Sequence, residues 1–390
     1  MLDPDVKYNI LSMDGGPAAP VQIRILRKIE AKYPGFLAET DMFAGTSDGA
    51  VLTAFLASRL PEDKAEAKRI SLDIIDDAIQ LSNITIRALQ PRPWSMLQFM
   101  TGFGPLVEYR RMEAALQYAF GDMKIRDINR RILIASYDCN NWTMGNFTNV
   151  DILSQQADMP VYEAILASAS LPLYAPVYRA SNGRKFLDGV FVGNNPSLVA
   201  TGTLLQSIWL THHFAENTTE WHKIVERVRI LSMGVGEVHA EAQRPIESIP
   251  SLCQQLFGID WLEEHDGSLR WGWWQWLLER PALLASIVYH SQSAATALEG
   301  DMFLTPYNHH RYAPPSNTIS VVFDLARRNA DKVIQEAEQC AEELWANDAR
   351  RTKGFGSDNP TTNMLRFIKH RWMKPGGQET WPKNRDSDVE

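Results

Sequence analysis

Short apolar runs alternate with amphipathic stretches in the first part of the chain, and glycine-rich turns separate them. Residues 7–12 and 41–44 are each predicted to form a short buried strand, because a few consecutive apolar residues end at turn-forming ones. Residues 21–33 and 50–60 follow these strands with apolar side chains at helical spacing. A strand, a glycine turn and a helix, repeated in this order, favour a parallel sheet covered by helices on both faces.

The alternation continues with less regularity beyond residue 60. Further helices are predicted over 61–80, 106–120, 162–170, 325–347 and from about 196, and further strands over 131–137, 143–148, 185–187 and 228–233. The predicted fold class is therefore α/β, a three-layer α/β/α sandwich with a mostly parallel central sheet over residues 1–310. Residues 311–374 are expected to form a helical C-terminal extension, and the polar residues 375–390 a disordered tail.

Composition narrows the functional classes. The 390 residues carry a formal net charge of −8, which argues against duplex nucleic acid as a partner. The 3 cysteines are odd in number and far apart, which suits a reducing compartment better than a disulfide framework. The polar start of the chain shows no secretory signal, and no apolar run reaches the roughly 18 residues of a membrane span. We therefore expect a cytoplasmic protein, with peripheral contact to a membrane as a further option.

The segment Gly45-Thr46-Ser47-Asp48-Gly49 is the first candidate for chemistry. Its Gly-x-Ser-x-Gly pattern lies between a predicted strand and a predicted helix, which is the context of a nucleophile elbow. In such an elbow a strained turn exposes the serine hydroxyl, and the N-terminus of the next helix stabilises developing negative charge. By itself the pattern is equally compatible with an ordinary strand-to-helix turn.

A nucleophilic serine needs a base. The histidines stand in no convincing strand-end loop, and the pairs His212-His213 and His309-His310 lack further ligands at zinc-site spacing. We interpret these histidines as solvated surface residues, and we predict no metal site and no cofactor. Asp188 is the better base, because it ends a short predicted strand, where catalytic carboxylates are often found.

Five segments resemble, in the same order, those of the patatin-like phospholipases, which are serine acyl hydrolases with a Ser-Asp dyad. The segments are residues 10–16, 45–49, 167–176, 188–196 and 231–236. The resemblance implies a sandwich of patatin type in which Ser47 is the nucleophile and Asp188 the base. It also implies elbow or supporting roles for further residues: Gly45, Gly49, Asp14, Gly189, Asn194 and Asn195.

The first of these segments departs from the family pattern. Where the family's oxyanion loop has a third glycine, a cationic residue and another glycine, this chain has Pro17, Ala19 and Pro20. Proline has no backbone N–H, and an oxyanion hole is built from such donors. We expect a rebuilt or switchable loop whose donors are backbone amides, namely those of Gly15, Gly16, Ala18 and Asp48. The side chain of Asp48 is interpreted as a stabilising charge at a helix N-terminus.

Aromatic-rich segments leave two alternatives for membrane contact. Residues 91–105 contain Trp94, Met96, Phe99, Met100 and Phe103, which favour a bilayer interface but would equally pack as a cap over the sheet. The tryptophans within 271–276 carry the same two interpretations. The basic and aromatic segment 364–374 would touch anionic lipid or a partner, or form a solvated helix with one packed stripe.

The sequence thus predicts a lipid acyl hydrolase that cleaves fatty-acyl ester bonds of a phospholipid or another acyl lipid, with transient contact to a membrane surface. Two alternatives stay open. The altered loop favours a conditionally activated bacterial effector, a toxin or defence phospholipase that requires an activating ligand or protein partner. The other alternative is a non-catalytic lipid-binding or scaffold protein that has kept the fold.

Overall fold

The computed structural model describes residues 6–16, 19–150, 156–212, 218–234, 281–304, 308–313, 330–350 and 360–373. Its centre is a parallel sheet in the order β3-β2-β1-β8-β9. These strands are β3 (Arg131–Asp138), β2 (Met42–Thr46), β1 (Tyr8–Met13), β8 (Val228–Met233) and β9 (His309–Tyr312). All neighbours in this group run in the same direction, so their carboxyl ends share one edge of the sheet.

Short antiparallel strands complete the sheet on the far side of β3. They are β4 (Thr143–Met144), β5 (Phe147–Thr148), β6 (Tyr178–Arg179) and β7 (Lys185–Asp188). Strands β4, β5 and β7 pair with β3, and β6 pairs with β7. The prediction of a partner strand within residues 143–148 is confirmed as two short pieces.

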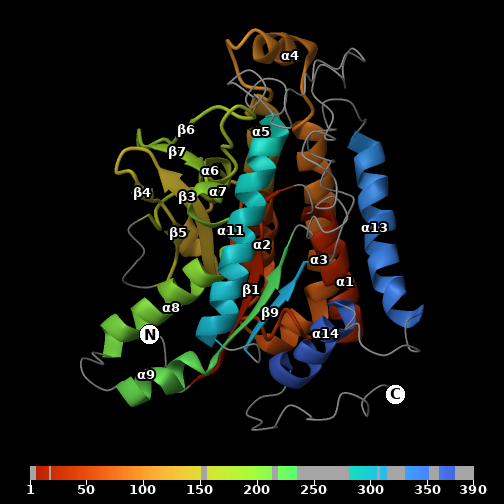
Figure 1. Cartoon of the computed structure of the whole chain (residues 1–390), viewed down its shortest axis with the longest axis vertical. Helices are drawn as coiled ribbons and strands as arrows, with labels where there is room; N and C mark the ends of the chain where they lie inside the picture. Colours follow the sequence, from red (N-terminus) through yellow and green to blue (C-terminus); the bar gives the residue numbers. More distant parts are fainter. Residues whose placement is uncertain are drawn as a thin grey trace, which may run out of the picture.

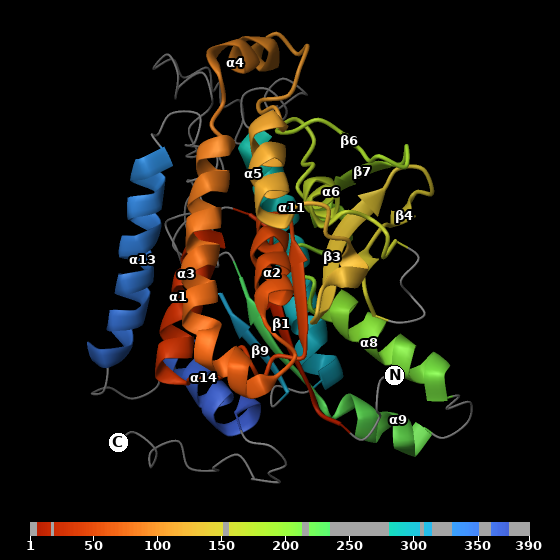
Figure 2. The same ribbon diagram turned by 180° about the vertical axis from the view of Figure 1, so that it is seen from behind.

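Helices cover both faces of this sheet. Figure 2 is seen from the face that is covered by α1 (Ala19–Lys32), α2 (Asp48–Arg59), α3 (Lys64–Ala88), α5 (Arg110–Phe120) and α13 (Ala330–Arg350). Figure 1 is seen from the opposite face, which is covered by α8 (Ser197–His212), α9 (Thr218–Val225) and α11 (Pro281–Leu304). The predicted α/β/α sandwich with a mostly parallel sheet is confirmed.

Two hydrophobic clusters lie between these layers. Leu11 and Met13 of β1 belong to the cluster under α1 and α2, whereas Tyr8 and Ile10 belong to the cluster under α8. Successive side chains of a strand point to opposite faces, so an apolar run with few polar residues is required where both faces are covered. The first predicted strand accordingly has apolar side chains on both faces, and its polar residues Asn9 and Ser12 are buried with hydrogen-bonded side chains.

Some elements differ from the prediction. The prolines within 91–105 led us to expect a break in the pattern, yet α4 (Pro93–Met100) is a helix that begins with Pro93 at its first position. A proline there loses no hydrogen bond, since the first N–H groups of a helix have no partner within it. Strand β9 was not predicted, because its four residues, His309–Tyr312, are mostly polar. Shorter elements that complete the fold are α6 (Val161–Ser168), α7 (Val190–Gly193) and the 3-10 helix η1 (Ile125–Asp127).

The C-terminal aromatic segment is packed into the protein. It forms α14 (Pro360–Phe367) and the π-helical turn η6 (Ile368–Trp372). Trp372 is buried and stacks on Phe36, with ring centroids 5.0 Å apart. The interpretation as a helix with one packed stripe is supported, and Phe367 and Trp372 are not available to a membrane.

Some expectations stay untested. The predicted division near residue 310 remains a prediction, and β9 runs across that position. The tryptophans within 271–276 and the tail 375–390 lie outside the described residues. Among the helices that are described, none is long and apolar enough to cross a membrane.

Candidate active site

Ser47 occupies a strained turn between β2 and α2. Its backbone has φ 52° and ψ −120°, a conformation that residues other than glycine rarely adopt. The residue directly precedes the first turn of α2, so its hydroxyl lies at the positive end of the helix dipole. This is the backbone arrangement of a nucleophile elbow.

The two glycines of the elbow, Gly45 and Gly49, stand where there is no room for a side chain. A Cβ atom on Gly45 would lie 2.6 Å from the carbonyl oxygen of Gly49. A Cβ atom on Gly49 would lie 2.6 Å from the carbonyl oxygen of Asp14, at the end of β1. Both distances are far below a van der Waals contact, so the elbow closes on itself and on β1 because these positions carry no side chain.

The register of the sheet brings Asp188 to Ser47. Thr46 of β2 is level with Ala135 of β3, and the next residue of β3, Ser136, is level with Asp188 of β7. The Ser47 hydroxyl donates a hydrogen bond of 3.0 Å to the Oδ2 atom of Asp188. The two residues proposed as a dyad therefore meet, although 141 positions separate them in the chain.

Asp188 has the environment of a base that works near neutral pH. Its side chain is fully buried, and its Oδ1 atom accepts a hydrogen bond of 2.8 Å from the amide of Val190. Burial raises the pKa of Asp188 to about 7, and the neighbouring charge of Asp48 acts in the same direction. Burial likewise raises the pKa of Asp48 to about 7. A carboxylate with this pKa both accepts and returns a proton at physiological pH.

Ser168, which the sequence analysis did not single out, connects the nucleophile to β3. Its hydroxyl donates to the carbonyl oxygen of Ala135 at 2.6 Å and accepts from the amide of Ser47 at 2.8 Å. Its own carbonyl oxygen accepts from the amide of Gly189 at 3.0 Å, directly after Asp188. One residue of the segment 167–176 thus fixes the backbone on both sides of the dyad.

The glycine turn after β1 faces the nucleophile. A Cβ atom on Gly15 would lie 3.0 Å from the Cβ atom of Ser47, so the turn passes directly beside the elbow. The Gly15 amide donates to the carbonyl oxygen of Asn194 at 3.2 Å, so in this arrangement that amide is engaged. Among the described residues, the amides of Gly16 and Asp48 donate to no other protein group. Ala18 lies outside the described residues.

Three of the predicted supporting residues, Asp14, Asn194 and Asn195, belong to one buried polar cluster together with residues that were not predicted. Asp14 accepts hydrogen bonds from Arg311 of β9 and from Ser293 of α11. Ser293 also accepts from the side-chain amide of Asn194, at 2.9 Å. The side-chain oxygen of Asn195 accepts from groups on three other elements: the hydroxyls of Ser12 and Ser232 and the amide of Ser197.

The interpretation of the histidines as solvated is wrong for one pair. His309 is buried, and its Nδ1 atom lies 2.8 Å from Asp301 Oδ1. The ring of His310 stacks on Phe367, and burial lowers the pKa of His310 to about 4. Both residues belong to β9, whose position between β8 and the last helices could not be recognised from its composition. His213 and the side chain of His212 lie outside the described residues.

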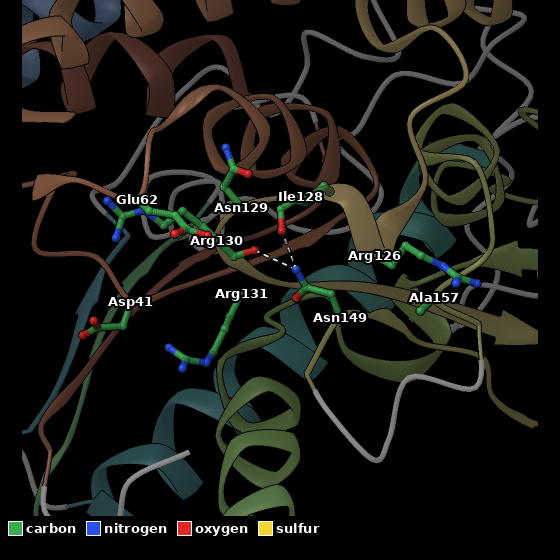
Figure 3. Close-up of a pocket in the computed structure, with 9 residues that line it drawn as sticks. All are labelled: Asp41, Glu62, Arg126, Ile128, Asn129, Arg130, Arg131, Asn149 and Ala157. Carbon is green, nitrogen blue, oxygen red and sulfur yellow. Dashed lines mark hydrogen bonds between the residues drawn. The ribbon is translucent and has the colours of Figure 1, made fainter. Parts of the chain in front are cut away.

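A separate pocket of about 380 Å³ lies at the opposite edge of the sheet (Figure 3). Asp41 comes directly before β2 and Arg131 begins β3, so the pocket is at the amino ends of these strands. Ser47 follows the carboxyl end of β2. The pocket therefore has no part in the site around Ser47.

Comparisons with known proteins agree with this geometry. Residues 11–201 match the family model described as patatin-like phospholipase. Protein teg of Priestia megaterium is 24% identical over 249 residues, which make up 61% of this chain and 66% of that protein. Patatin-like protein 3 of Oryza sativa is 25% identical over 262 residues, 63% of this chain and 58% of the rice protein. The alignments thus span less than two thirds of the length of these relatives.

The alignment with the solved structure of VipD from Legionella pneumophila covers 93% of this chain and 80% of the VipD chain, at 10% sequence identity. Its TM-score of 0.31 is too low to support an argument. The family match stands instead on residues 11–201, which contain the turn after β1, the elbow and Asp188. Residues 11–201 of the chain belong to the patatin-like phospholipase family, a family of lipid acyl hydrolases.

Proposed function

We propose that this protein is a serine lipid acyl hydrolase that cleaves fatty-acyl ester bonds with Ser47 as nucleophile and Asp188 as base. The observation that carries the proposal is the hydrogen bond of 3.0 Å from the strained Ser47 to a fully buried carboxylate. Burial raises the pKa of that carboxylate to about 7, which suits proton transfer near neutral pH. Nucleophile and base within hydrogen-bond reach are the signature of covalent catalysis by serine.

The reaction proceeds through an acyl-enzyme. Asp188 takes the proton of the Ser47 hydroxyl while the Ser47 oxygen attacks the ester carbonyl. The amides of Gly16 and Asp48 hold the resulting oxyanion, and the N-terminus of α2 adds its dipole. The departing alcohol takes the proton from Asp188. A water molecule, deprotonated by Asp188, then attacks the acyl carbonyl. The bond to the Ser47 oxygen breaks, Asp188 returns the proton to that oxygen, and the fatty acid is released.

Helix α4 is the proposed contact with the lipid surface. On α4, Trp94 and Leu97 are 63% and 51% exposed and Phe99 is buried, and Phe103, shortly after the helix, is 88% exposed. The chain after α4 is joined to the catalytic region, because the Tyr109 hydroxyl donates to the carbonyl oxygen of Ala169 at 2.8 Å. Aromatic and apolar side chains of this kind favour a bilayer interface. The proposed membrane contact thus lies on the helix that precedes the segment bonded to the backbone near Ser168.

Hydrolysis of lipid vesicles tests this function. Wild type is expected to release fatty acid from vesicles of phosphatidylcholine and phosphatidylglycerol, and Ser47→Ala to reduce the rate at least about 10³-fold. Ser58→Ala, which changes a buried serine on the same helix, is the matched control and should keep the wild-type rate. Equal rates for wild type and Ser47→Ala would refute the proposal.

The surface role of α4 has its own control. The double variant Trp94→Ala/Phe103→Ala is expected to lose several-fold in vesicle hydrolysis and to keep its rate on a soluble p-nitrophenyl ester. Tyr118→Ala removes a side chain that is 93% exposed near the other end of α5 and should change neither rate. Equal losses on both substrates would show that α4 supports the fold rather than the membrane contact.

A conditionally activated effector is the second candidate. Ser47 is only 7% exposed, and Pro17 stands where the family's loop has its third glycine. An activating ligand or protein that reshapes this loop would then open the site. Ester hydrolysis that appears only after addition of cell extract or nucleotide messengers would favour this candidate, and Ser47-independent lipid binding without hydrolysis would favour a scaffold.

A further inference from the structure

We infer that Arg311 is a positioning residue of the proposed hydrolase, which acts through Asp14 to hold the glycine turn beside Ser47. The inference rests on the proposed function and adds a residue from beyond the matched region 11–201. Arg311 lies on β9, 297 positions after Asp14. It touches neither Ser47 nor Asp188 through any hydrogen bond.

The ion pair between Arg311 and Asp14 is bidentate. The Nη1 atom of Arg311 donates to Asp14 Oδ1 at 2.6 Å, and its Nη2 atom donates to Oδ2 at 2.5 Å. Ser293 of α11 donates a third hydrogen bond to Oδ2, at 3.0 Å. The Nη1 atom also donates to Ser232 on the intervening strand β8, at 2.8 Å. The carboxylate and the guanidinium therefore have one orientation relative to each other.

The surroundings make this pairing necessary. The side chain of Asp14 is fully buried, and that of Arg311 is 13% exposed. Burial raises the pKa of Asp14, and the charge and hydrogen bonds of Arg311 act against that rise. A guanidinium stays protonated and matches both oxygens of a carboxylate, which a lysine does not. Gly234 makes room for it, since a Cβ atom there would lie 2.6 Å from Arg311 Cζ.

The cluster reaches the active site through the backbone next to Asp14. Gly15 follows Asp14 directly and lies against Ser47, while its amide donates to the carbonyl oxygen of Asn194. The side-chain amide of Asn194 donates to Ser293, the same hydroxyl that donates to Asp14. Asp14 and Gly15, at the start of the glycine turn, are therefore both attached to one buried cluster. A loosened cluster would move the amide of Gly16 relative to the ester oxygen that it is proposed to hold.

The sequence of the turn itself supplies no such anchor. Position 19, where the resemblance led us to expect a cation, is Ala19, and it is buried at the start of α1. The cation is instead Arg311 of β9. This strand pairs with β8, and β1 lies between β8 and β2. The late part of the chain thereby contributes to the geometry of a site whose reacting groups all lie before residue 201.

The test compares Arg311→Lys with the matched variant Arg229→Lys, another buried arginine, on β8 and near the amino end of that strand. The assays are hydrolysis of a soluble p-nitrophenyl ester, inhibition by a trifluoromethyl ketone and thermal melting. Arg311→Lys should lower kcat about 10–100-fold, keep KM within about threefold and weaken the ketone in proportion to kcat/KM. Arg229→Lys should keep wild-type kinetics.

Two outcomes overturn the inference. A lower melting temperature with unchanged kcat and unchanged ketone inhibition would show that Arg311 supports the fold alone. If Arg311→Lys does not fold, Ser293→Ala decides. Loss of the two hydrogen bonds of this hydroxyl, to Asp14 and from Asn194, should lower kcat about threefold to tenfold at constant KM. Wild type that lacks Ser47-dependent hydrolysis would refute the proposed function as well, whereas an active wild type with fully active cluster variants would refute only the role of Arg311.

Discussion

Two fully buried aspartates lie on either side of Ser47, and they have opposite electrostatic surroundings. Asp14 receives two hydrogen bonds from the guanidinium of Arg311. Asp188 receives one from the Ser47 hydroxyl and one from the amide of Val190, and no cation among the described residues offsets its burial. The comparison indicates that a cation opposes the effect of burial on the pKa at Asp14, whereas among the described residues none does so at Asp188.

The two aspartates also draw on different parts of the chain. Asp188 is positioned by β3, β7 and Ser168, all within residues 11–201. Asp14 also lies within residues 11–201, but its partners Ser293 and Arg311 belong to α11 and β9, outside that region. The proton-transfer group is therefore built by the matched domain, and the anchor of the turn is completed from outside it.

Removal of the proposed base should have the largest effect. Asp188→Asn is expected to lower kcat for a soluble ester about 10³–10⁴-fold, because an amide accepts no proton at neutral pH. KM should change little, since Asp188 is buried behind Ser47. Asp76→Asn, at an exposed position on α3, is the control. A loss below about tenfold would mean that another group acts as the base.

The anchoring pair should show its effect in stability. Arg311→Met leaves the carboxylate of Asp14 buried without its cation and should lower the free energy of unfolding by about 3–5 kcal/mol. The double variant Asp14→Asn/Arg311→Met removes both charges and should recover a large part of that loss. Urea unfolding measures both values. Asp188→Asn, by contrast, should not destabilise the protein, because it removes a buried charge that has no cationic partner.

The third prediction concerns pH. Asp188 acts as a base when it is ionised, and burial raises its pKa to about 7. The value of kcat/KM should therefore rise with pH, by about tenfold between pH 6 and pH 8. If the activity were already constant from pH 5 upward, Asp188 would be ionised as an ordinary exposed carboxylate is, and the contrast with Asp14 would fail.

Asp48→Asn should produce the smallest change. The charge of Asp48 is one of the causes that raise the pKa of Asp188, so its removal should move the inflection of the pH profile to lower pH by less than about one unit. The backbone amide of residue 48 stays in place, so the plateau rate should remain within about threefold of wild type. A pH profile shifted upward would contradict this account.

The sequence was sufficient to predict most of the sandwich. The runs that became β1, β2 and β8 are wholly buried, and short, mostly apolar runs that end at turn-forming residues favour buried strands. Ser47 and Asp188 were also predicted, since each follows a predicted strand, Ser47 between Gly45 and Gly49 and Asp188 directly before Gly189. Their contact depends on the register of β2, β3 and β7, which became known with the structure.

The roles of Arg311 and Ser168 could not be predicted from the local sequence pattern. Arg311 belongs to the strand His309–Tyr312, whose polar residues show no alternation, and its partner lies 297 positions away. The hydroxyl of Ser168 gains its role from backbone atoms of Ser47 and Ala135, which sequence spacing does not place beside it. Buried polar clusters of this kind depend on long-range geometry, whereas strands and helices follow from local periodicity.

The most direct measurement of the central claim is the rate and position of covalent labelling by a fluorophosphonate. The account predicts a single adduct on Ser47, located by mass spectrometry, that forms faster as the pH rises through about 7. It also predicts that Ser47→Ala is not labelled and that Asp188→Asn is labelled much more slowly. An adduct on another residue, or equal labelling of wild type and Asp188→Asn, would contradict the assignment of these two residues as nucleophile and base.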